Sequence, residues 1–297
     1  MRANRLLITV VAGLGLTLTA SVSAADLCAT DALDRHVCLP EPAERVVSLS
    51  PGATELLFSA GAGDSVVAVS AWSDYPVPAA ELPQVGDSNR LDLEAIVGLS
   101  PDLVVAWTDG NSRAQLDRLA DLGVPVFWLA PREFEDIARA VETLGGLTGH
   151  TPVAERAAAE FREGFSTLQA TYRDSAPVRV FYQVWDQPLM TVNGDELISK
   201  AIALCGGTNV FADLSRLVPR ISVETVLAAD PEVIITAGRG DSDRDWLASW
   251  QSYSSVTAVA RDNLYLVSPS LLQRPTFRML EGARELCGIL EQARARL

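Results

Sequence analysis

The sequence has few of the residues that metal sites and common catalytic sites require. Its 297 residues include two histidines, His36 and His150, and four cysteines, none of them in a CxxC pair. Transition-metal sites are built from clusters of such ligands, so we predict no metal site. The GxSxG, HExxH and P-loop motifs are also absent, and Gly61-Ala62-Gly63 lacks the third glycine of a dinucleotide-binding loop. These absences argue against an enzyme and against a bound cofactor.

Long apolar runs are absent beyond the first residues of the chain. Arg2 and Arg5 precede an apolar run over residues 6–20, and small residues then lead to a cleavage site before Ala25. This pattern is typical of a secretory signal peptide over residues 1–24. The run is short for a transmembrane anchor, and Cys28 comes too late to carry a lipid anchor. We therefore expect a soluble protein exported to the periplasm.

Basic residues are outnumbered, with 24 Lys and Arg against 38 Asp and Glu, which gives a formal net charge of −14. Without the two arginines of the signal peptide, the charge is about −16. A surface this acidic repels nucleic acid phosphates and anionic lipid head groups, so we expect neither as a partner. It favours a protein partner with exposed arginines.

The four cysteines are expected to form disulfides, because export takes the chain to an oxidising compartment. Three pairings are possible. We favour Cys28–Cys38, which closes a short loop, and Cys205–Cys287, which ties distant segments together. In the chain-entropy model the longer loop contributes about 4 kcal/mol to stability. The first pair belongs to an expected N-terminal extension over residues 25–43.

An internal repeat is the most informative pattern in the chain. Residues 93–106, LEAIVGLSPDLVVA, recur as residues 223–236, VETVLAADPEVIIT, and each copy predicts a short helix, a proline-acid turn and a buried strand. Two further strand-like matches keep nearly the same offset, 45–49 with 179–183 and 127–131 with 265–269. The repeat indicates two similar lobes, although strand-helix units can also resemble one another by chance.

The repeat predicts an α/β fold of two Rossmann-like lobes with parallel sheets, joined by one long rigid helix. We assign the N-terminal lobe to residues 44–150 and the C-terminal lobe to residues 176–297. The joining segment, 151–175, opens with Thr151-Pro152 and consists mainly of strong helix formers, with Gly164 as the exception. In such sheets ligands bind at the carboxyl ends of the strands, so we expect one cleft between the lobes.

Several ordered motifs resemble the cobalamin-binding periplasmic proteins, within the helical-backbone class of solute-binding proteins. They are 45–51 (RVVSLSP) with Thr54-Glu55-Leu56, then 73–76 (SDYP), 84–86 (QVG), 93–107 and 205–211 (CGGTNVF). The resemblance runs from about Glu44 to the C-terminus. It implies a monomer that captures cobalamin or another corrinoid for the permease of an ABC importer.

The resemblance assigns Glu94 and Glu224 to docking on the permease, one glutamate from each lobe. The two residues occupy equivalent positions in the repeat. Separated carboxylates can make charge-assisted hydrogen bonds to arginine pockets. The alternative is that each acid only favours the N-terminus of its own helix.

The expected ligand surface combines aromatic faces with hydrogen-bonding groups, which suits a broad, flat corrin with amides around its edge. Tryptophan core packing and ordinary helix capping at Ser50 are the alternatives. Trp246 and Trp250 are expected to pack a helix instead. The candidate ligand residues are Ser50, Pro51, Trp72, Tyr75, Trp107, Trp185, Ser270, Leu271, Leu272, Gln273 and Arg274.

Two departures from the family pattern leave the ligand open. Leu271, Leu272 and Ser88 stand where the family carries aromatic side chains. A siderophore or haem carrier of the same class is one alternative, with Tyr75 as a conceivable haem ligand. An exported enzyme on the same frame is another, but it would need cleft cysteines or a catalytic acid–base pair.

Overall fold

The computed structural model describes residues 27–238 and 241–297. The expected signal peptide, 1–24, lies outside the described residues, as do Arg239 and Gly240 of the loop before Trp246. Within the described ranges no helix is long and apolar enough to span a membrane.

The N-terminal lobe is built on a parallel sheet of four short strands in the order β4-β3-β5-β6. The strands are buried apolar runs, as expected for a sheet that helices cover on both faces. Its strands are β3 (Val46–Ser48), β4 (Val66–Val69), β5 (Leu103–Trp107) and β6 (Val126–Leu129). Its helices are α1 (Pro51–Ser59), α2 (Leu93–Gly98), α3 (Arg113–Asp121) and α4 (Phe134–Leu147), with 3₁₀ turns η1 (Gly63–Ser65) and η2 (Val77–Glu81).

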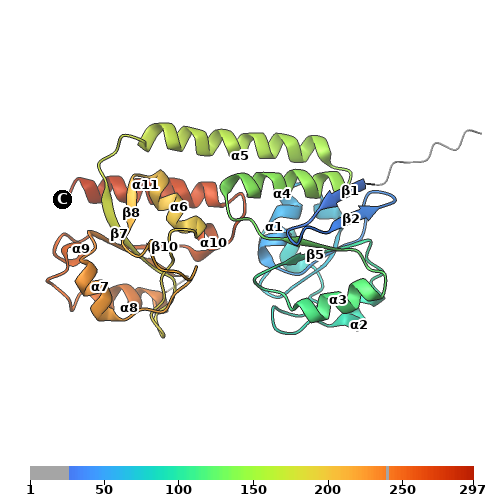
Figure 1. Ribbon diagram of the computed structural model, residues 1–297, viewed down its shortest axis with the longest axis horizontal. Coiled ribbons are helices and arrows are strands. Elements are labelled where there is room, and N and C mark those ends of the chain that lie inside the picture. The colour runs from blue at the N-terminus through green and yellow to red at the C-terminus, as the bar shows by residue number, and fades with distance from the viewer. Residues whose placement is uncertain (1–26, 239–240) are drawn as a thin grey trace, which may run out of the picture.

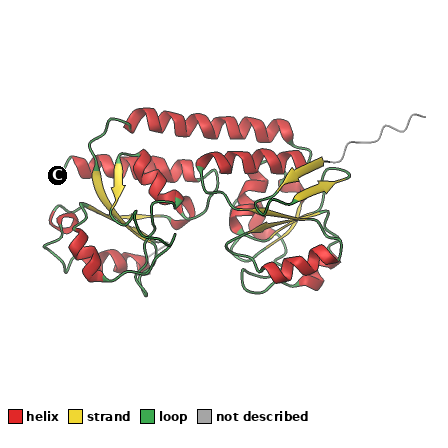
Figure 2. Ribbon diagram, in the orientation of Figure 1, coloured by secondary structure: helices red, strands yellow, loops and turns green. Residues whose placement is uncertain are grey.

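The C-terminal lobe repeats this topology, with the parallel order β8-β7-β9-β10. Figure 2 shows the two sheets side by side, each with its own helices. The strands are β7 (Val178–Gln183), β8 (Gly207–Asn209), β9 (Val233–Ala237) and β10 (Leu264–Val267). The helices are α6 (Leu197–Leu204), α7 (Val223–Ala229), α8 (Asp241–Trp250), α9 (Thr257–Ala260), α10 (Pro269–Leu272) and α11 (Met279–Arg294). The predicted two-lobe α/β fold is confirmed.

The internal repeat extends to side-chain contacts. In the N-terminal lobe, Asp102 accepts the backbone N–H of Arg45 at 2.9 Å, and Arg45 Nε donates to the Leu99 carbonyl at 2.9 Å. In the C-terminal lobe, Glu232 accepts the backbone N–H of Arg179 at 2.8 Å, and the Arg179 side chain donates to the Ala229 carbonyl. Each contact set holds the end of α2 or α7 against the first strand of its sheet.

The joining helix is α5 (Thr151–Tyr172), which begins at the expected residue and ends three residues before position 175. Figure 1 shows α5 running across both lobes, above α4 and α11. Arg162 fixes it to α4 through hydrogen bonds of 2.7 and 2.9 Å to Glu135 and through an ion pair with Glu142. These carboxylates raise the pKa of Arg162 above its ordinary value.

Aromatic stacking ties α5 to both lobes. The Phe165 ring stacks on Phe134 of α4 with centroids 4.0 Å apart, and the Phe161 ring stacks on Phe277, just before α11, at 4.5 Å. The main hydrophobic core therefore continues from one lobe to the other through α5. The connection between the lobes is a packed layer of helices with α5 as its longest member.

The N-terminal extension is a disulfide-bonded hairpin. Strands β1 (Leu27–Thr30) and β2 (His36–Leu39) are antiparallel, and Cys28 lies directly opposite Cys38, to which it is bonded. The turn between its strands reaches β6, where Ala32 N donates to the Trp128 carbonyl at 2.9 Å and Arg35 donates to the Val126 carbonyl at 3.3 Å. It covers an edge strand that would otherwise be open to pairing with another chain.

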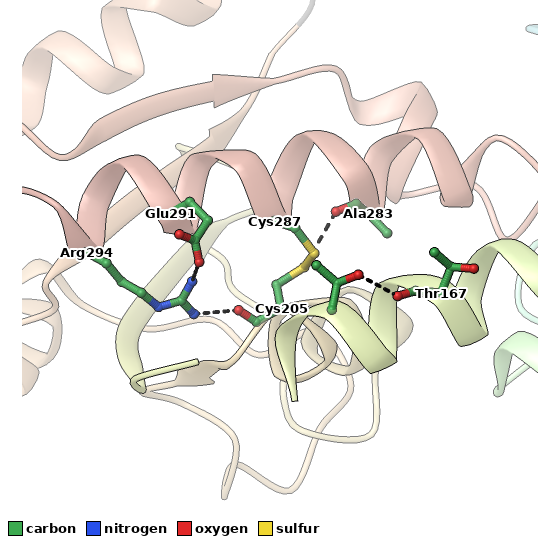
Figure 3. Close-up of a disulfide and its surroundings, with 7 residues drawn as sticks. Thr167, Cys205, Ala283, Cys287, Glu291 and Arg294 are labelled. Carbon is green, nitrogen blue, oxygen red and sulfur yellow. Dashed lines mark hydrogen bonds and ion pairs between the residues drawn. A yellow bond between two sulfur atoms is a disulfide. The ribbon is translucent and has the colours of Figure 1, made fainter. Parts of the chain in front are cut away.

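The second disulfide joins Cys205, at the end of α6, to Cys287 in the middle of α11. Figure 3 shows Arg294 of α11 beside it, and its Nη2 donates to the Cys205 carbonyl at 2.5 Å. Both predicted pairings are confirmed, and neither disulfide lies in the space between the lobes.

Candidate functional site

A cavity between the lobes lies at the carboxyl ends of the strands, where parallel sheets bind ligands. Its volume is about 230 Å³, and both lobes line it. The lining residues from the N-terminal lobe are Trp107, Asp109, Pro131 and Arg132. Those from the C-terminal lobe are Asp195, Glu196, Leu197, Leu217, Val218, Gln273 and Pro275. We call this space the interlobe cleft.

Three large aromatic side chains face solvent outside the lining of the cleft, and we take them as its border. Trp72 is 71% exposed, Trp185 53% and Tyr75 44%. Trp185 follows β7 and stands at the carboxyl end of that strand, as predicted, and Trp72, which the family resemblance assigned, follows the end of β4. Exposed aromatic faces beside a cleft suit the binding of a flat apolar ligand. The cavity itself is smaller than the roughly 300–1,000 Å³ of typical ligand pockets, so a larger ligand would also lie over these rings.

Trp107 is fixed at the base of the cleft. Its backbone N–H donates to Asn111 Oδ1 at 2.8 Å, and Asn111 Nδ2 donates to the Leu49 carbonyl at 2.9 Å. The indole lies against Gly52 at the start of α1, where a Cβ atom would come within 3.2 Å of the ring. Glycine at this position lets the tryptophan pack on the first turn of the helix.

Trp185 forms an aromatic pair in the C-terminal lobe. Its ring meets Trp246 of α8 edge to face, with centroids 5.4 Å apart. Trp250 is buried instead, and its Nε1 donates to Gln183 Oε1 at 2.8 Å. Trp250 packs the lobe, as expected, whereas Trp246 supports an exposed aromatic face.

Ser50 and Pro51 form an ordinary helix start. Ser50 is the N-cap of α1, and its Oγ accepts the N–H of Ala53 at 3.0 Å, while Pro51 occupies the first turn. Both residues are half-buried at the carboxyl end of β3. The Ser50 hydroxyl is therefore committed to the cap.

The segment Ser270 to Arg274 divides into two groups. Gln273 is exposed and lines the cleft, and Ser270 and Leu271 are half-buried. Leu272 is buried in the main core, so its side chain supports the segment from behind. Arg274 is also buried, among carboxylates rather than facing the cleft.

Those carboxylates form a polar cluster that sequence analysis missed. Glu55 on α1 is 3% exposed, and its Oε1 accepts from Arg274 at 3.0 Å and from Arg278 at 2.6 Å. Its Oε2 accepts from Thr276 at 2.8 Å and from Arg278 Nε at 3.0 Å. A single acid within an apolar helix was the available signal, because a buried charge must be paired.

The same arginines reach the aromatic residues of the N-terminal lobe. Arg274 donates to Asp74 at 2.6 Å and to the Trp72 carbonyl at 3.2 Å, and the Arg278 guanidinium lies 4.0 Å from the Tyr75 ring centre. Burial is the largest single influence on the pKa of Arg278 and lowers it, but Glu55 together with Tyr75 and Asp74 outweighs burial and raises this pKa.

Sequence analysis also missed Glu196, a carboxylate that lines the cleft beside Asp195 and whose pKa is shifted. It caps α6, and its carboxylate accepts the Ile198 N–H at 2.7 Å. Burial raises the pKa of Glu196, while the charges of Arg132 and Lys200 act in the opposite direction. Lys200 of the C-terminal lobe also donates to the carbonyl of Arg132 in the N-terminal lobe at 2.7 Å. This hydrogen bond links the two lobes, as the bonds of Glu55 do.

Glu94 and Glu224 occupy matching places on the two lobes. Both are exposed in the first turn of a short helix, α2 or α7, after an Asp92 or Ser222 cap. Hydrogen bonds from Ser222 and from the backbone lower the pKa of Glu224. Figure 1 shows α2 and α7 on the side of the molecule opposite α5.

Neither histidine belongs to the cleft. His36 lies on β2 beside Thr30, and His150 precedes α5 beside Thr148. No group of three or more histidine, cysteine or acidic side chains that could hold a metal ion occurs in the described part of the chain.

A larger cavity, of about 650 Å³, lies under α5 rather than between the sheet edges. Its apolar lining comes from Phe134 of α4 and from Phe161 and Phe165 of α5 itself. Of its three cations, Arg162 is engaged by Glu135 and Glu142 and Lys200 by Glu133, while Arg173 is exposed at the end of α5. We therefore take the interlobe cleft, with its exposed aromatic border, as the functional site.

Two parallel-sheet lobes that face each other across an aromatic-bordered cleft define a bilobal α/β binding protein. The family model described as periplasmic binding protein matches residues 46–271. The chain therefore belongs to the periplasmic binding protein family.

Curated relatives share most of their length with this chain. A vitamin B12-binding protein of Vibrio parahaemolyticus is 37% identical over 254 residues, which cover 86% of this chain and 92% of the relative. One from Yersinia pestis is 39% identical over 247 residues, which cover 83% and 86%.

Solved structures show the same fold. The periplasmic vitamin B12-binding protein BtuF of Vibrio cholerae superposes with a TM-score of 0.78 at 35% identity, over 85% of this chain and 98% of that one. A periplasmic heme-binding protein of Roseiflexus has a TM-score of 0.75 at 24% identity, a level that establishes the shared fold alone.

Proposed function

We propose that this protein captures vitamin B12 or a close corrinoid in the interlobe cleft and delivers it to the permease of an ABC importer. The observation that carries the proposal is the identity of 37–39% to proteins named for vitamin B12 binding, over more than four fifths of the chain. The exposed faces of Trp72, Tyr75 and Trp185 suit a broad, flat ligand.

The proposed location is the periplasm, reached through removal of residues 1–24. The family supports this location, and so do the two disulfides, which persist in oxidising compartments. We propose that the mature protein acts as a monomer, and without catalysis because its family and its relatives are named for binding.

Titration of the mature protein with cyanocobalamin, cobinamide, haem and a ferric hydroxamate siderophore tests the proposal. We expect calorimetry to give a Kd below about 1 μM for cyanocobalamin. Trp72→Ala should weaken that binding at least about tenfold, because it removes an exposed aromatic face. Leu122→Ala, which removes an exposed apolar side chain of the N-terminal lobe outside the cleft, is the control and should bind as the wild type does. Tighter binding of haem or of the siderophore than of either corrinoid would contradict the proposal.

A further inference from the structure

Glu55 connects the two lobes through charge. It lies on α1 of the N-terminal lobe. Its partners belong to the C-terminal lobe, where Thr276 lies between α10 and α11 and Arg278 is the N-cap of α11. Figure 1 shows α1 and α10 on either side of the boundary between the lobes. Both carboxylate oxygens of Glu55 are bound from the other lobe, by three side chains over distances of 2.6–3.0 Å.

The arginines that Glu55 binds also contact two exposed aromatic residues of the cleft border. Arg274 donates to the Trp72 carbonyl, and Arg278 lies over the Tyr75 ring. Trp72 has a backbone φ of +67°, in the left-handed region that non-glycine residues rarely adopt. Such a conformation persists where surrounding contacts determine it, and the bond from Arg274 is one of them. Asp74, between the two aromatics, is a further partner of Arg274.

Arg274 is thereby removed from direct ligand binding. Its side chain is buried among Glu55, Asp74 and the Trp72 carbonyl, while its neighbours Gln273 and Pro275 line the cleft. The charged cluster thus lies immediately behind the ligand-facing surface and supports it from both lobes.

We infer that Glu55 is a positioning residue for the ligand. It holds Arg274 and Arg278 of the C-terminal lobe where they set the Trp72 backbone and the Tyr75 ring of the N-terminal lobe. Affinity for a flat ligand then depends on a carboxylate that does not touch the ligand. The inference rests on the proposed function for its ligand, but the geometry can be tested without any ligand.

The experiment compares full-length mature wild type with Glu55→Gln and Arg278→Lys, each labelled with 5-fluorotryptophan. The Trp72 signal is assigned by its loss in Trp72→Phe. Without ligand, we expect both variants to shift or broaden the ¹⁹F signal of Trp72 while that of the buried Trp128 stays in place. With cyanocobalamin, we expect affinity to fall at least about tenfold. Arg284→Lys, an exposed change on α11, is the matched control and should leave both measurements at wild-type values.

Arg278→Lys decides the outcome if Glu55→Gln does not fold, because it keeps the charge and removes only the forked geometry. A folded Arg278→Lys variant with an unchanged Trp72 signal and wild-type affinity would overturn the inference. If the wild type itself binds no corrinoid, the proposed function fails. The ligand-free Trp72 signal then still decides whether the cluster positions this residue.

Discussion

Glu196 has the most distinctive chemistry of any single residue in the cleft. It caps α6 and faces a cavity that it shares with Asp109, Asp195 and Arg132. Burial raises the pKa of its carboxyl, so the folded state keeps the proton to a higher pH than the unfolded chain does. The raised pKa makes the stability of the protein depend on pH. Protonated Glu196 gives its full contribution to stability below the pKa of glutamate in the unfolded chain, about 4.3, and this contribution is lost as pH rises through the pKa of the folded state.

Glu196→Gln should therefore raise the melting temperature at pH 7 by roughly 1–3 °C, because it removes a desolvated charge and keeps an oxygen that can accept the Ile198 N–H. The difference should shrink as pH falls toward 4, where the wild-type carboxyl is also neutral. Thermal melts between pH 4 and 8 measure this, with the exposed Asp195→Asn as control. A variant that melts below the wild type at pH 7 would show that ionised Glu196 stabilises the fold.

At the level of elements, close helix packing explains two glycines that propensity alone disfavours. A Cβ atom on Gly145 of α4 would lie 2.2 Å from the Cβ of Ala154 on α5. One on Gly164 of α5 would lie 2.3 Å from the end of the Leu280 side chain on α11. Glycine lets α5 approach both of the helices on which it packs.

Gly145→Ala should destabilise the protein by about 1–3 kcal/mol, because overpacking at a rigid contact outweighs a propensity gain of about 1 kcal/mol. Gly146→Ala is the matched control, since no atom lies within 4 Å of its Cβ position. That change should stabilise by about 0.5–1 kcal/mol. Urea unfolding of the two variants measures both values, and equal effects would contradict the packing argument.

For the whole molecule, the layer of helices that joins the lobes holds Glu94 and Glu224 at a set separation. Phe165 stacks toward one lobe and Phe161 toward the other, and Glu55 adds buried ion pairs across the boundary. We therefore predict small hinge motion on ligand binding. A rigid pair of exposed carboxylates can recognise a partner by spacing as well as by charge.

Glu94→Arg with Glu224→Arg should reduce corrinoid uptake by cells at least about tenfold, because two charge-assisted contacts become repulsive. Cyanocobalamin affinity of the purified variant should not change, since neither residue lines the cleft. Glu155→Arg with Glu163→Arg, both exposed on α5 on the opposite side, is the matched control for charge. Unchanged uptake in the first variant would contradict the proposed docking role of Glu94 and Glu224.

Much of the fold was predictable because the informative patterns are local. The repeat at 93–106 and 223–236 predicts α2–β5 and α7–β9, which occupy equivalent places in the two sheets. Helix formers after Thr151-Pro152 predict α5, and export with four cysteines predicts disulfides. The strand-end positions of Trp107 and Trp185 followed from one rule, that ligands meet the carboxyl ends of parallel strands, whereas Trp72 was assigned by the family resemblance.

The sequence by itself therefore determined the elements, the duplication and the edge of each sheet that carries the cleft, since each depends on residues close together in the chain. Only the tertiary structure decided which side chains face that cleft. Arg274 pairs with Glu55, 219 residues away, and Leu272 turns into the core beside it. Such contacts depend on how two finished lobes pack together, and no periodicity within either lobe encodes that packing.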